Sequence, residues 1–293
     1  MNQKNVTLAD FQIILPKYHQ DQAELIEWSA ARHGLIDGAR FEKIFHRYAV
    51  NPEKIQQRYF ECPDALQSPT AVDPTLLYQH TDSKPEGAGI DQRANFFQTR
   101  ANQIFEEFYP EACVPPDHLI HVSCTGYVAP SAAQLRARHW QQRTAVTHAY
   151  HMGCYAALPA SRMAAAFAQT TANQRTDIVH TEMCSLHMNP ADHSPEQMVV
   201  QSLFADGHIK YSATCDPSAR EGFRVMHFQE WILPDSAEDM SWVPAPWGMR
   251  MTLSREVPSK IAANLRGFVQ RLAEDSGVSL SELLKNSIFA VHP

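Results

Sequence analysis

The sequence has no excess of basic residues and no long apolar run. Its 25 Lys and Arg residues are outnumbered by 32 Asp and Glu residues, which gives a formal net charge of -7 and an isoelectric point near 6.1. This balance argues against a general nucleic-acid-binding protein, because such proteins carry a basic surface. No apolar run is long enough to span a bilayer, and the polar start (MNQKN, residues 1–5) lacks the apolar core of a signal peptide. We therefore expect no nucleic-acid partner, no membrane span and a cytoplasmic location.

Four further motifs are missing. The six cysteines are scattered and form no Cys-x-x-Cys pair, which predicts reduced thiols and no disulfide framework. The chain contains neither a glycine-rich phosphate-binding loop nor a serine-centred nucleophile elbow, which disfavours nucleotide-binding and serine-hydrolase classes. His180, Cys184, His187 and His193 lie close in sequence, but they lack the paired spacing of a zinc site. We expect no metal and no tightly bound cofactor.

What the sequence does contain is an alternation of strand-like and helix-like segments. With 293 residues and 44% hydrophobic content, the chain can form one large domain or two similar halves. Apolar patterning predicts strands at residues 6–15, 54–60, 118–124, 144–150, 176–182, 208–215, 223–233, 249–253 and 287–291. It predicts helices at residues 20–31, 40–48, 75–79, 91–109, 131–138, 156–169, 194–204, 258–274 and 279–285. This order indicates a layered α/β protein.

Cys154 is the residue whose position points most directly to chemistry. It follows the predicted strand 144–150 and precedes the small-residue helix 156–169, so it lies at a strand-to-helix junction. Gly153 allows a tight turn there. The free N–H groups and the dipole at a helix start stabilise a thiolate, which is the nucleophilic form of cysteine. From this segment alone, a nucleophile and a buried packing cysteine are equally good interpretations.

Several segments together resemble the type III polyketide synthases, the family of chalcone and stilbene synthases. Six segments occur in the order and at the separations of that family: residues 118–127 (HLIHVSCTGY), 152–156 (MGCYA), 177–187 (DIVHTEMCSLH), 203–207 (LFADG), 231–236 (WILPDS) and 289–293 (FAVHP). Ala205 stands where the family has a glycine. The similarity extends from about residue 54 to the end of the sequence, and the bacterial branch is the more similar.

The resemblance implies the thiolase fold, in which two similar α/β halves stack as αβαβα layers. Residues 1–221 would form the half that carries the nucleophile, and residues 222–293 would form an incomplete second half. The resemblance also implies a homodimer that acts on small-molecule acyl thioesters of coenzyme A, with malonyl-CoA as the extender. An acyl carrier protein is an alternative acyl donor.

The same resemblance assigns roles to two residues in the reaction. Cys154 would take a starter acyl group from coenzyme A as a thioester, and His292 would pair with its thiolate. The enolate formed when malonyl-CoA loses carbon dioxide would then attack the acyl group. Repetition of this decarboxylative Claisen condensation would build a polyketide, which makes the expected activity that of an acyltransferase.

Other residues are assigned to binding. Arg58 matches a basic segment near the coenzyme A entrance of the family, although a solvated surface arginine explains it equally well. The resemblance places Thr125, Tyr127, His187 and Met188 in the substrate pocket. For Thr125 and Tyr127, ordinary turn and packing roles are at least as good an explanation.

The family's catalytic asparagine lies beyond the His-Pro segment, whereas this sequence stops at Pro293. We therefore expect a chain truncated after the catalytic His-Pro, with an open sheet edge and uncovered apolar surface. Two alternatives to a multi-step synthase follow. One is an enzyme similar to ketoacyl carrier-protein synthase III that performs a single condensation, and the other is a non-catalytic or degenerate partner subunit of a condensing enzyme.

Overall fold

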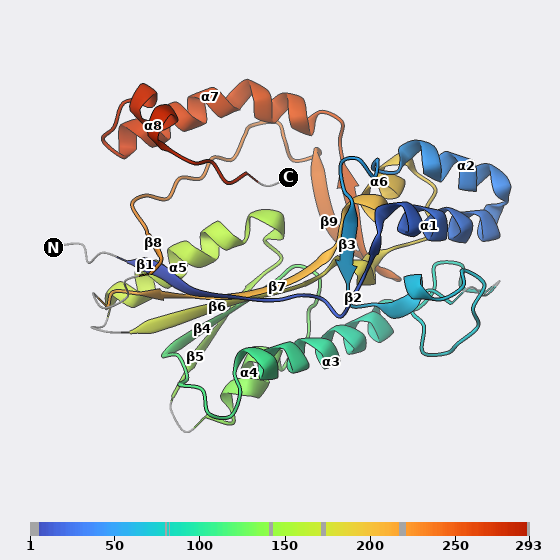
Figure 1. The fold of residues 1–293 in the computed structure, drawn as a ribbon, viewed down its shortest axis with the longest axis horizontal. Helices are drawn as coiled ribbons and strands as arrows, with labels where there is room; N and C mark the ends of the chain where they lie inside the picture. Colours follow the sequence, from blue (N-terminus) through green and yellow to red (C-terminus); the bar gives the residue numbers. More distant parts are fainter. Residues whose placement is uncertain are drawn as a thin grey trace.

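The centre of the molecule is a six-stranded mixed sheet, seen nearly edge-on in Figure 1. The structure is a computed structural model that describes residues 6–79, 81, 83–140, 143–170, 174–216 and 221–291. The strands, in the spatial order β5-β4-β6-β7-β1-β8, are β1 (Thr7–Ile14), β4 (His118–Ser123), β5 (Ala145–Tyr150), β6 (Arg175–Met183), β7 (Asp206–Thr214) and β8 (Phe223–Arg224). β4 is parallel to β5 and β6, whereas β7 is antiparallel to both β6 and β1.

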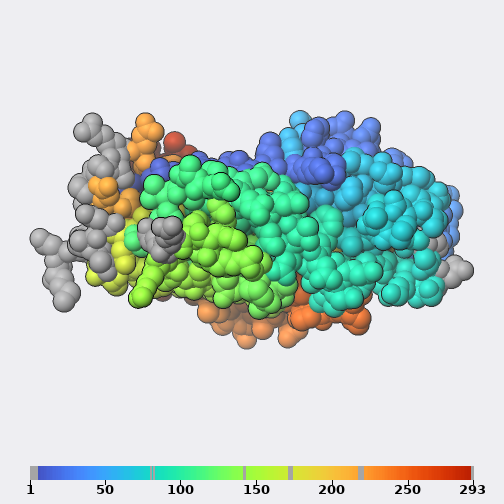
Figure 2. Space-filling model, turned by 90° about the horizontal axis from the view of Figure 1, so that it is seen from below, coloured from blue at the N-terminus to red at the C-terminus, as the bar shows by residue number. Residues whose placement is uncertain are grey.

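Helices cover both faces of this sheet (Figure 1). α3 (Ile90–Phe108) and α4 (Ala132–Ala137) lie against one face, and Figure 2 views the molecule from that side. α5 (Ala157–Thr170) lies against the other face. Because β4 is covered on both faces, its apolar residues do not alternate with polar ones: Leu119 joins the core on the α3 side, and Ile120 joins the core on the α5 side. The sequence prediction of a layered α/β protein is therefore confirmed.

Small side chains bring α5 close to the sheet. Ala156, Ala160, Ala164 and Ala168 recur every fourth residue and are all buried, and the first three belong to the core that α5 shares with the strands. Residues four positions apart share one face of a helix, so this alanine stripe lets the helix backbone approach the sheet. The packing holds the start of α5 beside the carboxyl end of β5, where Cys154 lies.

The remaining elements surround one end of the sheet. They are α1 (Gln22–Asp37), α2 (Ala39–Tyr48) and α6 (Pro195–Leu203), the antiparallel pair β2 (Tyr18–Asp21) and β3 (Gln57–Phe60), and the hairpin of β9 (Met240–Ala245) and β10 (Gly248–Leu253). Short 3-10 turns are η1 (Pro63–Leu66), η2 (Gly153–Tyr155) and η3 (Cys184–His187). α7 (Val257–Asp275) and α8 (Leu280–Asn286) lie beyond α5, farther from the sheet (Figure 1).

Five segments differ from the sequence prediction, one of which is β2 (Tyr18–Asp21), a strand that was not predicted. The predicted strand 223–233 yields only the two residues of β8, and the predicted strand 287–291 is irregular, with Ile288 fully exposed. Apolar and β-branched composition favours a strand only where a neighbouring strand supplies hydrogen bonds, and the described residues provide none at 287–291. The predicted helix 75–79 is a turn. β9 was not predicted, because Pro244 disfavours a strand in sequence and is tolerated only in an edge position.

Candidate active site

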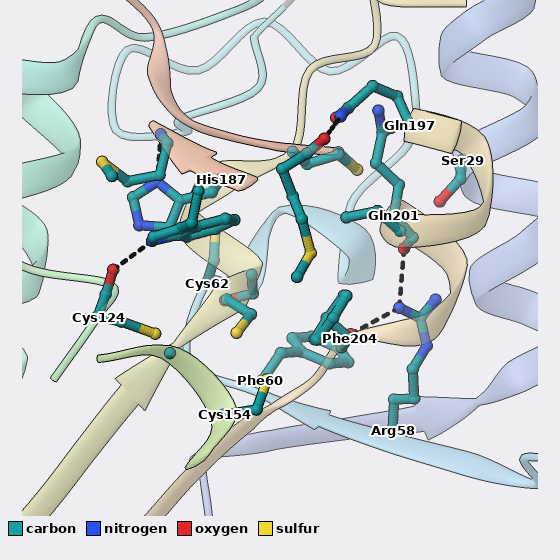
Figure 3. Close-up of a pocket in the computed structure, with 18 of the residues that line it drawn as sticks. Ser29, Arg58, Phe60, Cys62, Cys124, Cys154, His187, Gln197, Gln201 and Phe204 are labelled. Atoms are coloured by element: carbon teal, nitrogen blue, oxygen red, sulfur yellow. Dashed lines mark hydrogen bonds between the residues drawn. The ribbon is translucent and has the colours of Figure 1, made fainter. Parts of the chain in front are cut away.

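A cavity of about 390 Å³ opens among the carboxyl ends of β4 and β5, the helices α1 and α6, and the hairpin β9–β10 (Figure 3). Cys154 lines this cavity and is exposed to solvent, which places its thiol at the opening. Cavities at the carboxyl ends of parallel strands are common ligand sites in α/β proteins. The location and the free thiol together make this cavity the candidate active site.

The backbone around Cys154 forms a tight turn between β5 and α5. Gly153 has a φ angle of 75°, in the left-handed region that glycine adopts without strain, so the expectation of a glycine-dependent turn is confirmed. His151 has a φ angle of 62°, which is uncommon for a residue with a side chain. Such strained positions cluster at functional sites, because the surrounding structure must hold them. The turn leaves Cys154 in η2, directly before α5.

The electrostatic surroundings of Cys154 differ from the sequence prediction. The helix start was expected to lower the pKa of the thiol, whereas the pKa is raised above its usual value. Partial loss of solvent is the larger cause, and the negative charge of Glu182 adds to it. Among the described residues, the groups around Cys154 therefore favour the neutral thiol over the thiolate.

Glu182 is a half-buried carboxyl group near the end of β6. Its oxygens accept hydrogen bonds from the backbone N–H of Cys124 at 3.0 and 3.1 Å and from the Thr125 hydroxyl at 2.8 Å. Burial raises the pKa of Glu182 to about 7, against the opposing effect of these donors. Glu182 is therefore partly ionised at neutral pH, and its charge raises the pKa of both Cys124 and Cys154.

His187 lines the cavity, as predicted, but its ring nitrogens are both occupied. Nε2 lies 2.8 Å from the carbonyl oxygen of Thr125, so it carries the proton and donates. Nδ1 lies 3.0 Å from the backbone N–H of Met249 and accepts. Burial lowers the pKa of His187 to about 4. The ring therefore connects two parts of the cavity wall and is not available for proton transfer at neutral pH.

The neutral state of His187 gives a direct test by nuclear magnetic resonance. We expect its ring protons to show no titration between about pH 8 and pH 5.5, since the folded-state pKa lies far below the ordinary value near 6.5. Below about pH 6.5 the unfolded chain binds this proton more readily, so the contribution of His187 to stability declines as pH falls towards 4. Loss of the signal in His187→Gln assigns it, and a midpoint near pH 6 would contradict the structure.

Arg58 is buried, with 8% of its surface exposed, and lines the inner part of the cavity. Its guanidinium donates to the side chain of Gln22 at 2.7 Å and to the backbone oxygens of Gln201 and Phe204, both at 2.9 Å (Figure 3). Burial lowers the pKa of Arg58 to about 10, with Asp206 opposing the shift. The interpretation as a solvated surface residue is therefore wrong, and the predicted contact to coenzyme A phosphate stays a prediction.

The other predicted residues divide between the cavity and its surroundings. Met188 lines the cavity, whereas Thr125 and Tyr127 are not among the described lining residues. The Thr125 side chain is buried, and its hydroxyl donates to the Glu182 carboxylate. The Tyr127 hydroxyl donates to the backbone oxygen of Cys124 at 3.0 Å. His292 lies outside the described residues, so its pairing with Cys154 stays a prediction.

The sequence analysis missed three features of the site. Four of the six cysteines line the one cavity, namely Cys62, Cys124, Cys154 and Cys184. His151 also lines this cavity, and its ring Nδ1 forms a hydrogen bond with the Tyr127 hydroxyl. The role of Glu182 could have been suspected, because it is an acidic residue within an apolar strand next to a loop. The gathering of the cysteines had no sequence signal.

Two negative findings hold for the residues that the structure describes. No helix there is long and apolar enough to cross a membrane. Within the same ranges, no group of three or more His, Cys, Asp or Glu side chains is arranged to hold a metal ion. His180 and His187 bind protein partners instead, respectively the hydroxyl of Tyr211 and the backbone at Thr125.

Known proteins with similar sequences are polyketide synthases. The chain is 32% identical over 145 residues, 48% of its length, to "Probable polyketide synthase 1" of Dictyostelium discoideum, of which it covers 5%. It is 29% identical over 185 residues, 60% of its length, to type III polyketide synthase C of Arabidopsis thaliana, of which it covers 47%. The chain thus spans about half of the plant relative and a small part of the Dictyostelium protein. No family profile matches the chain.

Solved structures show the same fold over nearly the whole chain. The TM-score is 0.78 with polyketide synthase I of the brown alga Ectocarpus siliculosus, at 18% identity, covering 95% of this chain and 76% of the algal one. It is 0.71 with 1,3,6,8-tetrahydroxynaphthalene synthase of Streptomyces coelicolor, at 19% identity, covering 92% and 74%. The chain therefore has the thiolase fold. Its sequence is similar to those of polyketide synthases, among them a plant type III polyketide synthase and a putative chalcone synthase of Bacillus subtilis.

Proposed function

We propose that this chain is an acyltransferase that loads an acyl group from coenzyme A onto Cys154 and extends it with malonyl-CoA. The observation that carries the proposal is the exposed Cys154 thiol at the mouth of a mostly apolar cavity, in a thiolase fold whose homologues are polyketide synthases. The chain uses coenzyme A thioesters as substrates and needs no tightly bound cofactor. A homodimer is part of the same proposal, and size-exclusion chromatography with light scattering tests it.

In the loading step, the sulfur of Cys154 attacks the thioester carbonyl carbon of the acyl-CoA. A new carbon–sulfur bond forms and coenzyme A leaves as a thiolate. The proton of the Cys154 thiol passes to an imidazole, for which His292 is the predicted acceptor. Because the described surroundings raise the pKa of Cys154, this proton transfer is a necessary part of the step.

In the extension step, malonyl-CoA loses carbon dioxide and leaves an enolate of acetyl-CoA. The enolate carbon attacks the carbonyl carbon of the acyl-cysteine, the carbon–sulfur bond breaks, and Cys154 is regenerated as a thiolate. The product is a β-ketoacyl-CoA that is longer by two carbons.

Intact-protein mass spectrometry after incubation with a set of acyl-CoAs tests the loading step. We expect a mass increase of one acyl group in the wild type and none in Cys154→Ala. Cys113→Ala is the matched control, because Cys113 is a free cysteine outside the described cavity lining. The proposal fails if no acyl-CoA labels the wild type, or if Cys154→Ala is labelled as fully as the control.

The alternative of a single condensation with carrier-protein substrates is distinguished by the products. Incubation with acyl-CoA and excess malonyl-CoA gives chains extended more than once if the proposal is correct. A single two-carbon extension, together with a preference for acyl carrier protein over free coenzyme A, would instead favour the enzyme similar to ketoacyl carrier-protein synthase III.

A further inference from the structure

Methionines gather on the wall of the candidate active site. The chain has ten methionines, and five of them line the one cavity: Met152, Met188, Met240, Met249 and Met251. Methionine is unbranched, has three rotatable side-chain bonds and carries a polarisable sulfur, so it adapts its shape to what it contacts. Because half of the methionines line one cavity, the shape of this cavity can adapt to what it binds.

Three of these methionines share one face of the hairpin β9–β10. Side chains alternate between the two faces of a strand, and in β10 Met249 and Met251 are buried whereas Arg250 between them is exposed. Met251 pairs with Trp242 across the hairpin, and Met240 lies two residues before Trp242 on the same face. The cavity side of the hairpin is thus made of three methionines around one tryptophan, and we call it the methionine wall.

The backbone behind the methionine wall is fixed by polar contacts. The Trp242 indole donates to the carbonyl oxygen of Cys124 at 2.6 Å, and the backbone N–H of Met249 donates to His187 at 3.0 Å. The side chain of Gln197 in α6 donates to the carbonyl oxygen of Met251. The hairpin is therefore tied to three separate parts of the cavity rim. Adaptation of this wall comes from the methionine side chains and needs no movement of the backbone.

Aromatic side chains form a further part of the cavity lining, namely Trp28, Phe60, Tyr78 and Phe204 (Figure 3 shows Phe60 and Phe204). The Tyr78 hydroxyl is held by the backbone of Ser185 and Met188, and the Trp28 indole donates to the oxygen of Gln67 at 3.0 Å. These hydrogen bonds fix the Trp28 and Tyr78 rings, so adaptation to an acyl group falls to the methionine side chains.

The charged groups of the lining already have protein partners. Arg58 donates to Gln22 and to two backbone oxygens, and the Asp64 carboxylate accepts from the Cys62 thiol at 2.8 Å and from the backbone of Tyr78 at 2.6 Å. An acyl group that carries its own charge would lose its hydration there without gaining a matched partner, which is unfavourable. The cavity therefore suits uncharged, apolar acyl groups.

We infer that the methionine wall sets the range of acyl groups that the cavity accepts, and that this range covers uncharged aliphatic groups of different shape, both straight and branched. The identity of the ligand as an acyl thioester rests on the proposed function. The physical basis is that methionine side chains change rotamer to fill the space beside a narrow chain or to make room for a branch. A wall of β-branched residues cannot do this, because their χ1 angle is restricted.

The test compares binding of octanoyl-CoA with binding of two branched relatives, 2-ethylhexanoyl-CoA and cyclohexanecarbonyl-CoA, by isothermal titration calorimetry. The background is Cys154→Ala, so that binding is measured without transfer. We expect the three dissociation constants to agree within about tenfold. When the double substitution Met249→Ile/Met251→Ile is added, we expect the two branched ligands to lose at least about tenfold more affinity than octanoyl-CoA, because the stiff isoleucine side chains cannot make room for a branch.

Met198→Ile in the same Cys154→Ala background is the matched control, because Met198 is fully buried in a different core with Ile26 and Phe45. It should leave the ratio of the three dissociation constants unchanged. The inference is overturned if the double variant loses the same affinity for all three ligands, or if none of the three binds to Cys154→Ala. If Cys154→Ala binds them but the wild type is never acylated, the proposed function fails while the inference on the cavity stands.

Discussion

Replacement of Arg93 by methionine is expected to lower the free energy of unfolding by about 3–5 kcal/mol. Arg93 lies in α3 with 1% of its surface exposed. Its guanidinium donates to the backbone oxygens of Ala88 at 2.8 Å, Leu186 at 2.7 Å, Met188 at 2.8 Å and Glu86 at 2.9 Å. Methionine replaces the aliphatic part of the side chain but none of these donors, so four backbone oxygens lose a buried partner.

The loss is expected to be large because Arg93 connects three parts of the chain. It ties α3 to the loop at residues 86–88 and to the segment around η3, which carries His187 and Met188 into the cavity wall. The guanidinium also lies 4.9 Å from the ring of Tyr78, a further lining residue. The substitution should therefore loosen one wall of the candidate active site as well as the core.

Urea denaturation followed by circular dichroism measures this effect. Arg162→Met is the matched control, since Arg162 forms a 2.8 Å pair with Glu230 and its side chain is 53% exposed. Surface pairs of this kind contribute less than about 1 kcal/mol. A change for Arg93→Met that is as small as the control would show that the four backbone contacts do not stabilise the fold.

Replacement of Glu182 by glutamine is expected to make the Cys154 thiol several-fold more reactive at neutral pH and above. Glutamine keeps an oxygen that can accept from Cys124 and Thr125, but it removes the charge that raises the pKa of Cys154. In the wild type, the pKa of Glu182 is about 7, so its ionisation opposes thiolate formation as pH rises through neutrality. In the Glu182→Gln variant, no charge develops at this position, so thiolate formation at Cys154 is not opposed as pH rises.

The measurement is the rate at which iodoacetamide alkylates Cys154 between pH 6 and 10, followed by peptide mass spectrometry. The wild-type profile should rise less steeply near pH 7 than that of Glu182→Gln, which should follow the titration of one thiol. Asp64→Asn is the control, because Asp64 is a buried carboxyl group of the same cavity that acts on Cys62 and not on Cys154. Identical profiles for the wild type and Glu182→Gln would show that Glu182 has no electrostatic effect on Cys154.

The turn that carries Cys154 could be predicted from the sequence because its signals are local. A strand pattern, a glycine and a helix of small residues follow one another within residues 144–169, and the structure has β5, η2 and α5 there. The long helix predicted at 91–109 is also present, as α3 at Ile90–Phe108. In each case, periodic burial of neighbouring residues determines the element, and periodicity can be read from one sequence.

The walls of the cavity could not be predicted in this way. The bond from Trp242 to the oxygen of Cys124 joins positions 118 residues apart, and the bond from Cys124 to Glu182 joins positions 58 apart. No local pattern reports such pairs. The raised pKa of Cys154 was missed for the same reason, since the sequence shows the helix start beside the thiol but not the carboxyl group that folding brings near it.

The pairing of β1 with β7 has a consequence for the order in which the protein forms. Thr7 lies opposite Thr214, so β1 cannot pair with β7 until about 200 further residues have been synthesised. At a synthesis rate of about 5–20 residues per second, this takes roughly 10–40 s on the ribosome. The parallel strands β5, β4 and β6 can meanwhile assemble around α5. β1, which carries the exposed Phe11 and Ile13, is thus made well before the strand that pairs with it, and its unpaired edge can bind a chaperone during that interval.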